Sequence, residues 1–189
     1  MARGSLASQT PLVPIIELHT SVDAPIERVF DLCRSVDAHV ETAHATGERP
    51  VGGVTTGLLA LGDRVTWSAR HLGWRWRVTS QITAFDRPRS FRDSMVSGVF
   101  RRFDHDHEFA VRGETTLVRD VFDFTSPWGP LGRLAEALLV TRHMRRFLER
   151  RMRGLKRIAE SEAWTQYLPT VPGAAVAIGR AVAPEESLE

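Results

Sequence analysis

The sequence predicts an α+β fold in which a curved antiparallel β-sheet wraps around one long C-terminal α-helix. Three observations predict it: a strand followed by helical spacing near the start, a long stretch that alternates between apolar and polar residues, and a final amphipathic stretch. The 189 residues are enough for one domain with a buried core. A composition of 42% hydrophobic and 25% charged residues is typical of a globular protein.

The first predicted elements are a strand and two short helices. Apolar and polar residues alternate over 15–20, which predicts the strand. Pro25 is a favourable first residue for a helix, and apolar residues over 26–33 then recur at helical spacing. A second short helix is expected over 37–42, and the Gly-containing stretch 47–57 is expected to be a loop.

A meander of antiparallel strands is predicted for the middle of the chain. Two alternating stretches, 64–71 and 74–83, flank Leu72-Gly73, which predicts a hairpin with one apolar and one polar face. Three further strands are expected over 91–96, 100–111 and 115–126.

The last predicted element is an amphipathic helix of about seven or eight turns that begins near Leu131 and ends near Ser161. Its apolar stripe holds Leu134, Leu138, Thr141, Met144, Phe147 or Leu148, Met152 or Arg151, and Leu155. Its basic side holds Arg142, Arg145, Arg146, Arg150, Arg151, Arg153, Lys156 and Arg157. Glutamates interrupt this basic side, so we expect a solvated surface rather than a contact surface for an acidic partner or an anionic membrane.

The predicted organisation is one domain, 15–166, between a flexible leader, 1–14, and a disordered tail, 167–189, rich in Pro, small residues and Glu. Cys33 is the single cysteine, so no internal disulfide can form, and the cytoplasm is the expected location. A net charge of +2 gives no reason to expect a nucleic-acid partner. No run of 18 apolar residues predicts a membrane span, and the sequence leaves the oligomeric state open.

The candidate catalytic residues are His105 and Asp120. If Arg112-Gly113 is a two-residue turn, His105 lies opposite Asp120 on the inner face of the sheet. An imidazole beside a carboxylate on an apolar wall suits general acid/base chemistry on a carbonyl compound. The alternatives are a buried pair that only orients the sheet, an outward pair if the register slips by one residue, or a metal site with His107. We predict no metal and no cofactor.

The candidate ligand-binding residues lie on the same inner face. The same register pairs Phe103 with Phe122 and places His107 beside them. Trp67, Trp74 and Trp76 share one face of the first hairpin with His71, where they could stack on a planar ligand or fill the core. The expected cavity walls are therefore Trp67, His71, Trp76, Phe103, His107 and Phe122 from the sheet, and Leu138 from the long helix. Cys33 is expected to pack in the core.

Several short motifs resemble a known superfamily. They are SVDAP at 21–25, FDRPRSF at 85–91, FDHDHEF at 103–109, and RDVFDF at 119–124 leading into SPWGPLG. With the order of elements over about 15–164, they make the chain similar to the START-like or Bet v 1-like superfamily, also called SRPBCC. Within it, the chain resembles the bacterial polyketide cyclase-like or cell-division-inhibitor-like branch. That resemblance implies a helix-grip fold, whose sheet and long helix enclose a hydrophobic cavity.

The resemblance implies a partner for that cavity, namely an apolar small molecule that is polyketide-like or lipid-like. Binding of such a molecule is the expected function. The alternative is a cyclase, aromatase or dehydratase in which His105 and Asp120 shuttle protons on a poly-carbonyl substrate. A third hypothesis is a regulatory protein that acts through the basic side of the long helix. No motif of the superfamily fixes catalytic residues here, so none is assigned from the resemblance.

Overall fold

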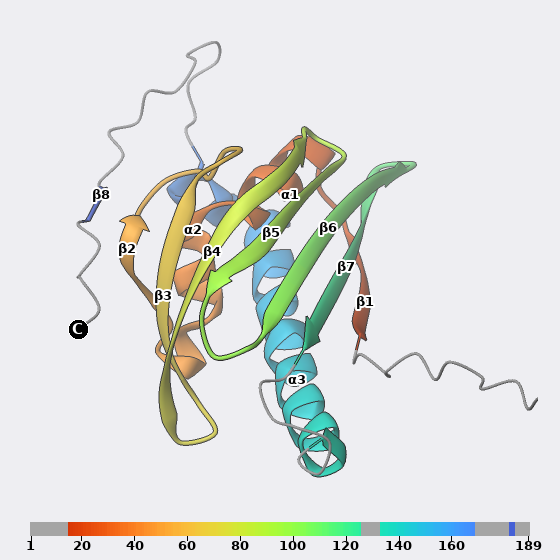
Figure 1. Cartoon of the computed structure of the whole chain (residues 1–189). Coiled ribbons are helices and arrows are strands. Elements are labelled where there is room, and N and C mark those ends of the chain that lie inside the picture. The colour runs from red at the N-terminus through yellow and green to blue at the C-terminus, as the bar shows by residue number, and fades with distance from the viewer. Residues whose placement is uncertain (1–14, 126–132, 169–181, 184–189) are drawn as a thin grey trace, which may run out of the picture.

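An eight-stranded antiparallel sheet curves around a long C-terminal helix (Figure 1). The computed structural model describes residues 15–125, 133–168 and 182–183, with the side chains of the long helix described from Leu139 onward. The strands follow the order β1-β7-β6-β5-β4-β3-β2-β8. The predicted α+β helix-grip fold is confirmed.

Most elements lie within two residues of their predicted bounds. The strands are β1 (Ile15–Val22), β2 (Arg49–Val54), β3 (Arg64–His71), β4 (Trp74–Asp86), β5 (Ser90–Ser97), β6 (Arg102–Arg112), β7 (Thr115–Thr125) and β8 (Val182–Ala183). The helices are α1 (Ile26–Cys33), α2 (Val36–Thr42), α3 (Arg133–Ala159) and the short 3-10 helices η1 (His44–Thr46) and η2 (Glu162–Gln166). Ser35 caps α2 by accepting a hydrogen bond from the Ala38 amide, which explains where this helix begins.

The predicted loop over 47–57 is wrong in part, because β2 occupies its middle, residues 49–54. Pro50 and the glycines after it argued against a strand. The structure accommodates them next to the sheet edge, where the pairing of β2 with β3 shifts register between Pro50 and Gly52. The two residues of β8 then pair with Gly53 and Val54.

The two tails fall mostly outside the described residues. The predicted leader and residues 169–181 and 184–189 of the predicted tail are not described. Within the predicted tail, Leu168 is buried against the core and Val182–Ala183 forms β8.

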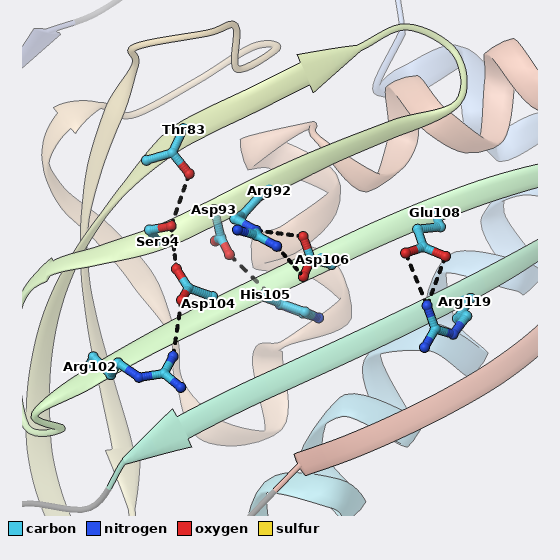
Figure 2. A network of polar contacts seen from close by, with 10 residues as sticks. All are labelled: Thr83, Arg92, Asp93, Ser94, Arg102, Asp104, His105, Asp106, Glu108 and Arg119. Carbon is cyan, nitrogen blue, oxygen red and sulfur yellow. Dashed lines mark hydrogen bonds and ion pairs between the residues drawn. The ribbon is translucent and has the colours of Figure 1, made fainter. Parts of the chain in front are cut away.

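Strand alternation divides the sheet into a buried inner face and a charged outer face. On β7, Thr116, Val118, Asp120, Phe122 and Phe124 are all buried, and their neighbours in sequence are more exposed. Figure 2 shows the outer face, where arginines bridge neighbouring strands. Its ion pairs are Arg92 with Asp106, Arg102 with Asp104 and Asp123, and Arg119 with Glu108 and Glu17.

Helix α3 covers the inner face with an apolar stripe. The buried side chains of the stripe are Val140, Met144, Leu148, Met152, Leu155, Ile158 and Ala159. The sequence left two stripe positions open, one to Phe147 or Leu148 and one to Met152 or Arg151. Leu148 and Met152 are buried in the stripe, and Arg151 is buried as well. Its placement on the basic outer surface was therefore wrong. No helix in the described part of the chain has the length and apolar character to cross a membrane.

Candidate functional site

A cavity lies between the inner face of the sheet, α1, α2 and α3. Its volume is about 110 Å³. Aromatic side chains form much of its wall: Trp67, Trp76, Phe91, Phe100, Phe103, Phe122 and Phe147. The wall also carries an unusual number of ionisable groups: His39, Glu48, His71, Asp93, His105, His107 and Arg151. The site is thus part apolar and part charged.

The structure brings together nearly all of the predicted site residues. Trp67, His71, Trp76, Phe103, His105, His107 and Phe122 line the cavity. Asp120 is buried behind the two histidines and does not itself line the cavity. The side chain of Leu138 lies outside the described residues.

The predicted pairing across β6 and β7 is wrong by two residues. Arg112 pairs with Thr115, so the turn residues are Gly113 and Glu114, and His107 rather than His105 lies opposite Asp120. Gly113 adopts a left-handed conformation with φ 63°, which suits the first central position of a tight hairpin turn. A shift of two residues keeps every side chain on its face, so the predicted inner face holds although the partners change.

His105 and His107 both lie close to the carboxylate of Asp120. Oδ1 of Asp120 is 2.5 Å from Nδ1 of His107 and 3.6 Å from Nε2 of His105. The two rings are neighbours, with centroids 4.0 Å apart, and His107 stacks on Phe91. Burial pushes the pKa of Asp120 upward, but the two imidazoles outweigh it, so its pKa lies below the usual range and the group is ionised.

Asp93 on β5 closes the cluster from the cavity side. Its Oδ1 lies 3.9 Å from Nδ1 of His105, and its Oδ2 accepts a 3.5 Å hydrogen bond from the Ser80 hydroxyl. Burial raises the pKa of Asp93 and lowers that of His105. Nδ1 of His107 and Oδ1 of Asp120 contact each other, but Oδ1 of Asp93 and Nε2 of His105 have no hydrogen-bond partner within the described part of the chain. Each such buried atom costs about 1–3 kcal/mol unless something satisfies it.

A second charged group lies in the cavity wall and was missed from the sequence. Nε2 of His39 is 3.2 Å from Oε2 of Glu48, and the His39 ring stacks on Trp67 with centroids 4.1 Å apart. Glu48 lies just before β2, in a stretch predicted to be a loop, so nothing in the sequence pattern placed it inward.

Arg151 on α3 is the third charged group, and only 5% of its surface is exposed. It donates a 3.3 Å hydrogen bond from Nη2 to the Cys33 carbonyl, and its Nε has no hydrogen-bond partner among the residues described. The helical pattern does place Arg151 at a possible position of the apolar stripe, which would direct its side chain inward. Because the neighbouring arginines lie on the basic side, Arg151 was assigned to that side with them.

Two more predicted residues differ in their surroundings. His71 hydrogen-bonds through Nδ1 to Nε2 of His143 on α3 at 2.9 Å, and it contacts Trp76 and Phe147. Trp74 shares the inner face with Trp76 but is 76% exposed, because it lies at the end of the hairpin beyond the cavity.

The predicted core position of Cys33 agrees with its surroundings. Burial raises the pKa of the Cys33 thiol, which matches a packed side chain rather than a nucleophile.

Comparison with known proteins identifies the family. Residues 14–160 match the model of a family described as "Polyketide cyclase / dehydrase and lipid transport". The chain belongs to this polyketide cyclase/dehydrase family. This membership confirms the SRPBCC resemblance, whereas a search among curated proteins finds no match.

Solved structures similar to this family member share its fold. TTHA0849 from Thermus thermophilus is 20% identical, with a TM-score of 0.64 over 76% of this chain and 95% of that chain. The ZhuI aromatase/cyclase from Streptomyces sp. R1128 is 14% identical, with a TM-score of 0.64 over 80% and 96%. A START superfamily protein from Mycobacterium smegmatis is 12% identical, with a TM-score of 0.58 over 77% and 97%. At these identities the similarity is one of fold.

Proposed function

We propose that this protein binds a compact aromatic or poly-carbonyl molecule in the cavity between the sheet and α3. The observation that carries the proposal is a cavity whose wall is lined by aromatic rings and yet holds several charged side chains. Aromatic walls favour a planar apolar ligand, and a few polar groups fix its orientation. Trp67, His71, Trp76, Phe103, His107 and Phe122 are the proposed ligand-binding residues.

The volume of the cavity favours a small ligand over a long one. Cavities that hold drug-sized ligands measure roughly 300–1,000 Å³, and an apolar cavity of about 150 Å³ can hold benzene. A volume of about 110 Å³ is somewhat below the second value, so a single aromatic ring is the largest ligand that the cavity could take with only small side-chain movements. A lipid chain or a full polyketide would need side chains to move, so a ring-sized polyketide-like compound is the ligand class that we propose.

Tryptophan fluorescence tests the proposal, because Trp76 lines the cavity and Trp74 does not. A panel of ring-sized aromatic and poly-carbonyl compounds should include at least one that changes the emission in a saturable way. Trp76→Leu should weaken this binding about tenfold or more, since it removes a stacking surface worth about 1.4 kcal/mol or more. Trp74→Leu, the matched control on the same strand, should leave the affinity unchanged. A flat response to the whole panel would argue that the aromatic wall is only a packed core.

Filling the cavity is a second test. Ala69 lines it from β3, so Ala69→Leu should place the added carbon atoms in the space that the ligand needs. We expect binding of the fluorescence-active compound to fall at least about tenfold, with a loss of stability below about 3 kcal/mol. Ala110→Leu makes the same change at an exposed position of β6 and should alter neither quantity. Unchanged affinity in Ala69→Leu would mean that the compound binds elsewhere.

A cyclase or dehydratase is the second candidate function. The observation that favours it is the position of His105, which lines the cavity with Asp120 behind it. His105 could hydrogen-bond a carbonyl oxygen of a bound poly-carbonyl compound, and the ionised Asp120 would fix the imidazole. As an enzyme, the protein should lose turnover of such a compound in His105→Ala while ligand uptake persists. As a binder, it should show no turnover in either form.

A further inference from the structure

Three side chains present metal-ligating atoms to one place in the cavity wall. Asp93 from β5 and His105 and His107 from β6 each offer one such atom, and these atoms all lie within 4.8 Å of one another. Asp93 pairs directly with His105 across the ladder, and His107 follows two residues later on the same face. Figure 2 shows Asp93 and His105 directed toward each other from neighbouring strands.

We propose that Asp93, His105 and His107 bind one divalent transition-metal ion, with zinc as the best match to the donors. Imidazole nitrogens and a carboxylate oxygen are regular zinc ligands. Three protein ligands are also the number found at catalytic zinc sites, where the fourth position stays open. All three residues line the cavity, so an ion held there would have its open position toward the ligand space.

Asp120 supports the proposal from behind the two histidines. One nitrogen of each ring lies toward it, Nδ1 of His107 and Nε2 of His105. This leaves Nε2 of His107 and Nδ1 of His105 for an ion. A carboxylate behind a ligating imidazole is a regular feature of metal sites, because it fixes the orientation and tautomer of the ring.

Unsatisfied polar atoms point the same way. Oδ1 of Asp93 faces His105 at 3.9 Å and has no hydrogen-bond partner among the described residues, whereas Oδ2 is held by Ser80. Nε2 of His105, whose residue is 5% exposed, also lacks a hydrogen-bond partner among the described residues and lies 3.6 Å from Asp120. An ion between the three ligands would satisfy Asp93 and draw the rings into alignment with Asp120.

The distances require only a small adjustment. Ligand atoms of a tetrahedral zinc ion lie about 3.4 Å apart, given bonds of about 2.0–2.2 Å. The present limit of 4.8 Å among the three atoms is therefore closed by side-chain movements of about 1 Å. The Asp93 side chain retains 25% of its exposure, which leaves it room to make this movement.

The ion would change what the polar wall does to a ligand. A zinc ion with an open position can bind a carbonyl or carboxylate oxygen and polarise it. His105 would then act as a ligand to the ion rather than as the direct partner of the carbonyl. The metal site does not depend on the proposed function, since the three ligands belong to the protein alone.

The test is a metal titration of the full chain after treatment with a chelator. In an isothermal titration with zinc chloride, we expect a binding stoichiometry of one Zn²⁺ ion per chain. Addition of cobalt chloride should produce the visible absorption of a tetrahedral Co²⁺ site. Asp93→Asn and His107→Gln should each weaken zinc binding about tenfold or more. His19→Gln, at an exposed histidine, and His143→Gln, in the other histidine pair, should leave binding unchanged.

Three results would overturn the proposal. The first is a wild-type chain that binds no stoichiometric zinc, which would mean that water satisfies the cluster. The second is zinc binding that survives both Asp93→Asn and His107→Gln. The third is binding that depends on His143 or His19 instead. Asp93→Asn is isosteric, so it still tests the site if His107→Gln fails to fold. A melting curve recorded without metal shows whether each variant is folded. None of these results bears on whether an aromatic compound enters the cavity.

Discussion

Phe30→Ala should lower the free energy of unfolding by about 3–5 kcal/mol, as expected for a large aromatic side chain removed from a core. Phe30 on α1 is fully buried. Its ring makes edge contacts with Phe85, Phe91 and Phe109, with centroids 5.4, 5.4 and 5.2 Å away. Such contacts add to the free energy of burial alone.

Urea unfolding measured by circular dichroism would give the change directly. In a melting curve, the same loss should appear as a fall of about 6–20 °C, because 1 kcal/mol corresponds to roughly 2–4 °C at this chain length. Phe30→Leu retains most of the apolar volume and should lose less than half as much. A loss below about 1 kcal/mol for Phe30→Ala would contradict the packing of α1 on the sheet.

Leu155→Ala should cost about 2–5 kcal/mol. Leu155 is 1% exposed and lies on the stripe of α3 that packs beneath α1 and the sheet. The helix offers a matched control in Leu139, which is 59% exposed. Leu139→Ala makes the same chemical change and should alter stability by less than about 0.5 kcal/mol. Equal losses in the two variants would show that the helix is rotated from the orientation described here.

The sequence predicted which side chains of β6 and β7 share the inner face, but it did not predict their partners. Alternation alone sets the face, and it is the same for two registers that differ by two residues. The charged residues of the outer face did not distinguish the two registers either, because both registers place an acidic residue opposite Arg119. The predicted register would set Arg119 opposite Asp106, whereas the actual one sets it opposite Glu108. The left-handed conformation of Gly113 at the first turn position was the missing information.

The charged part of the site was predicted only where it lies on strands. His105, His107 and Asp120 alternate with outward residues, so their inward direction was readable. Glu48 follows a short 3-10 helix and has no such pattern. Arg151 was assigned to the surface because charged residues are rarely fully buried, and a cavity that receives the guanidinium is visible only in three dimensions.

The order of strands in the sheet has a consequence for synthesis of the chain. β1 pairs with β7, and Ile15 and its partner Asp123 are separated by more than 100 positions. At roughly 5–20 residues per second, the ribosome needs about 5–20 s to make that stretch. Until β7 and then α3 emerge, the part of the aromatic inner surface that α3 packs against stays exposed. The nascent chain should therefore depend on chaperones for longer than one whose neighbouring strands are all consecutive, and contacts this distant also predict slow refolding.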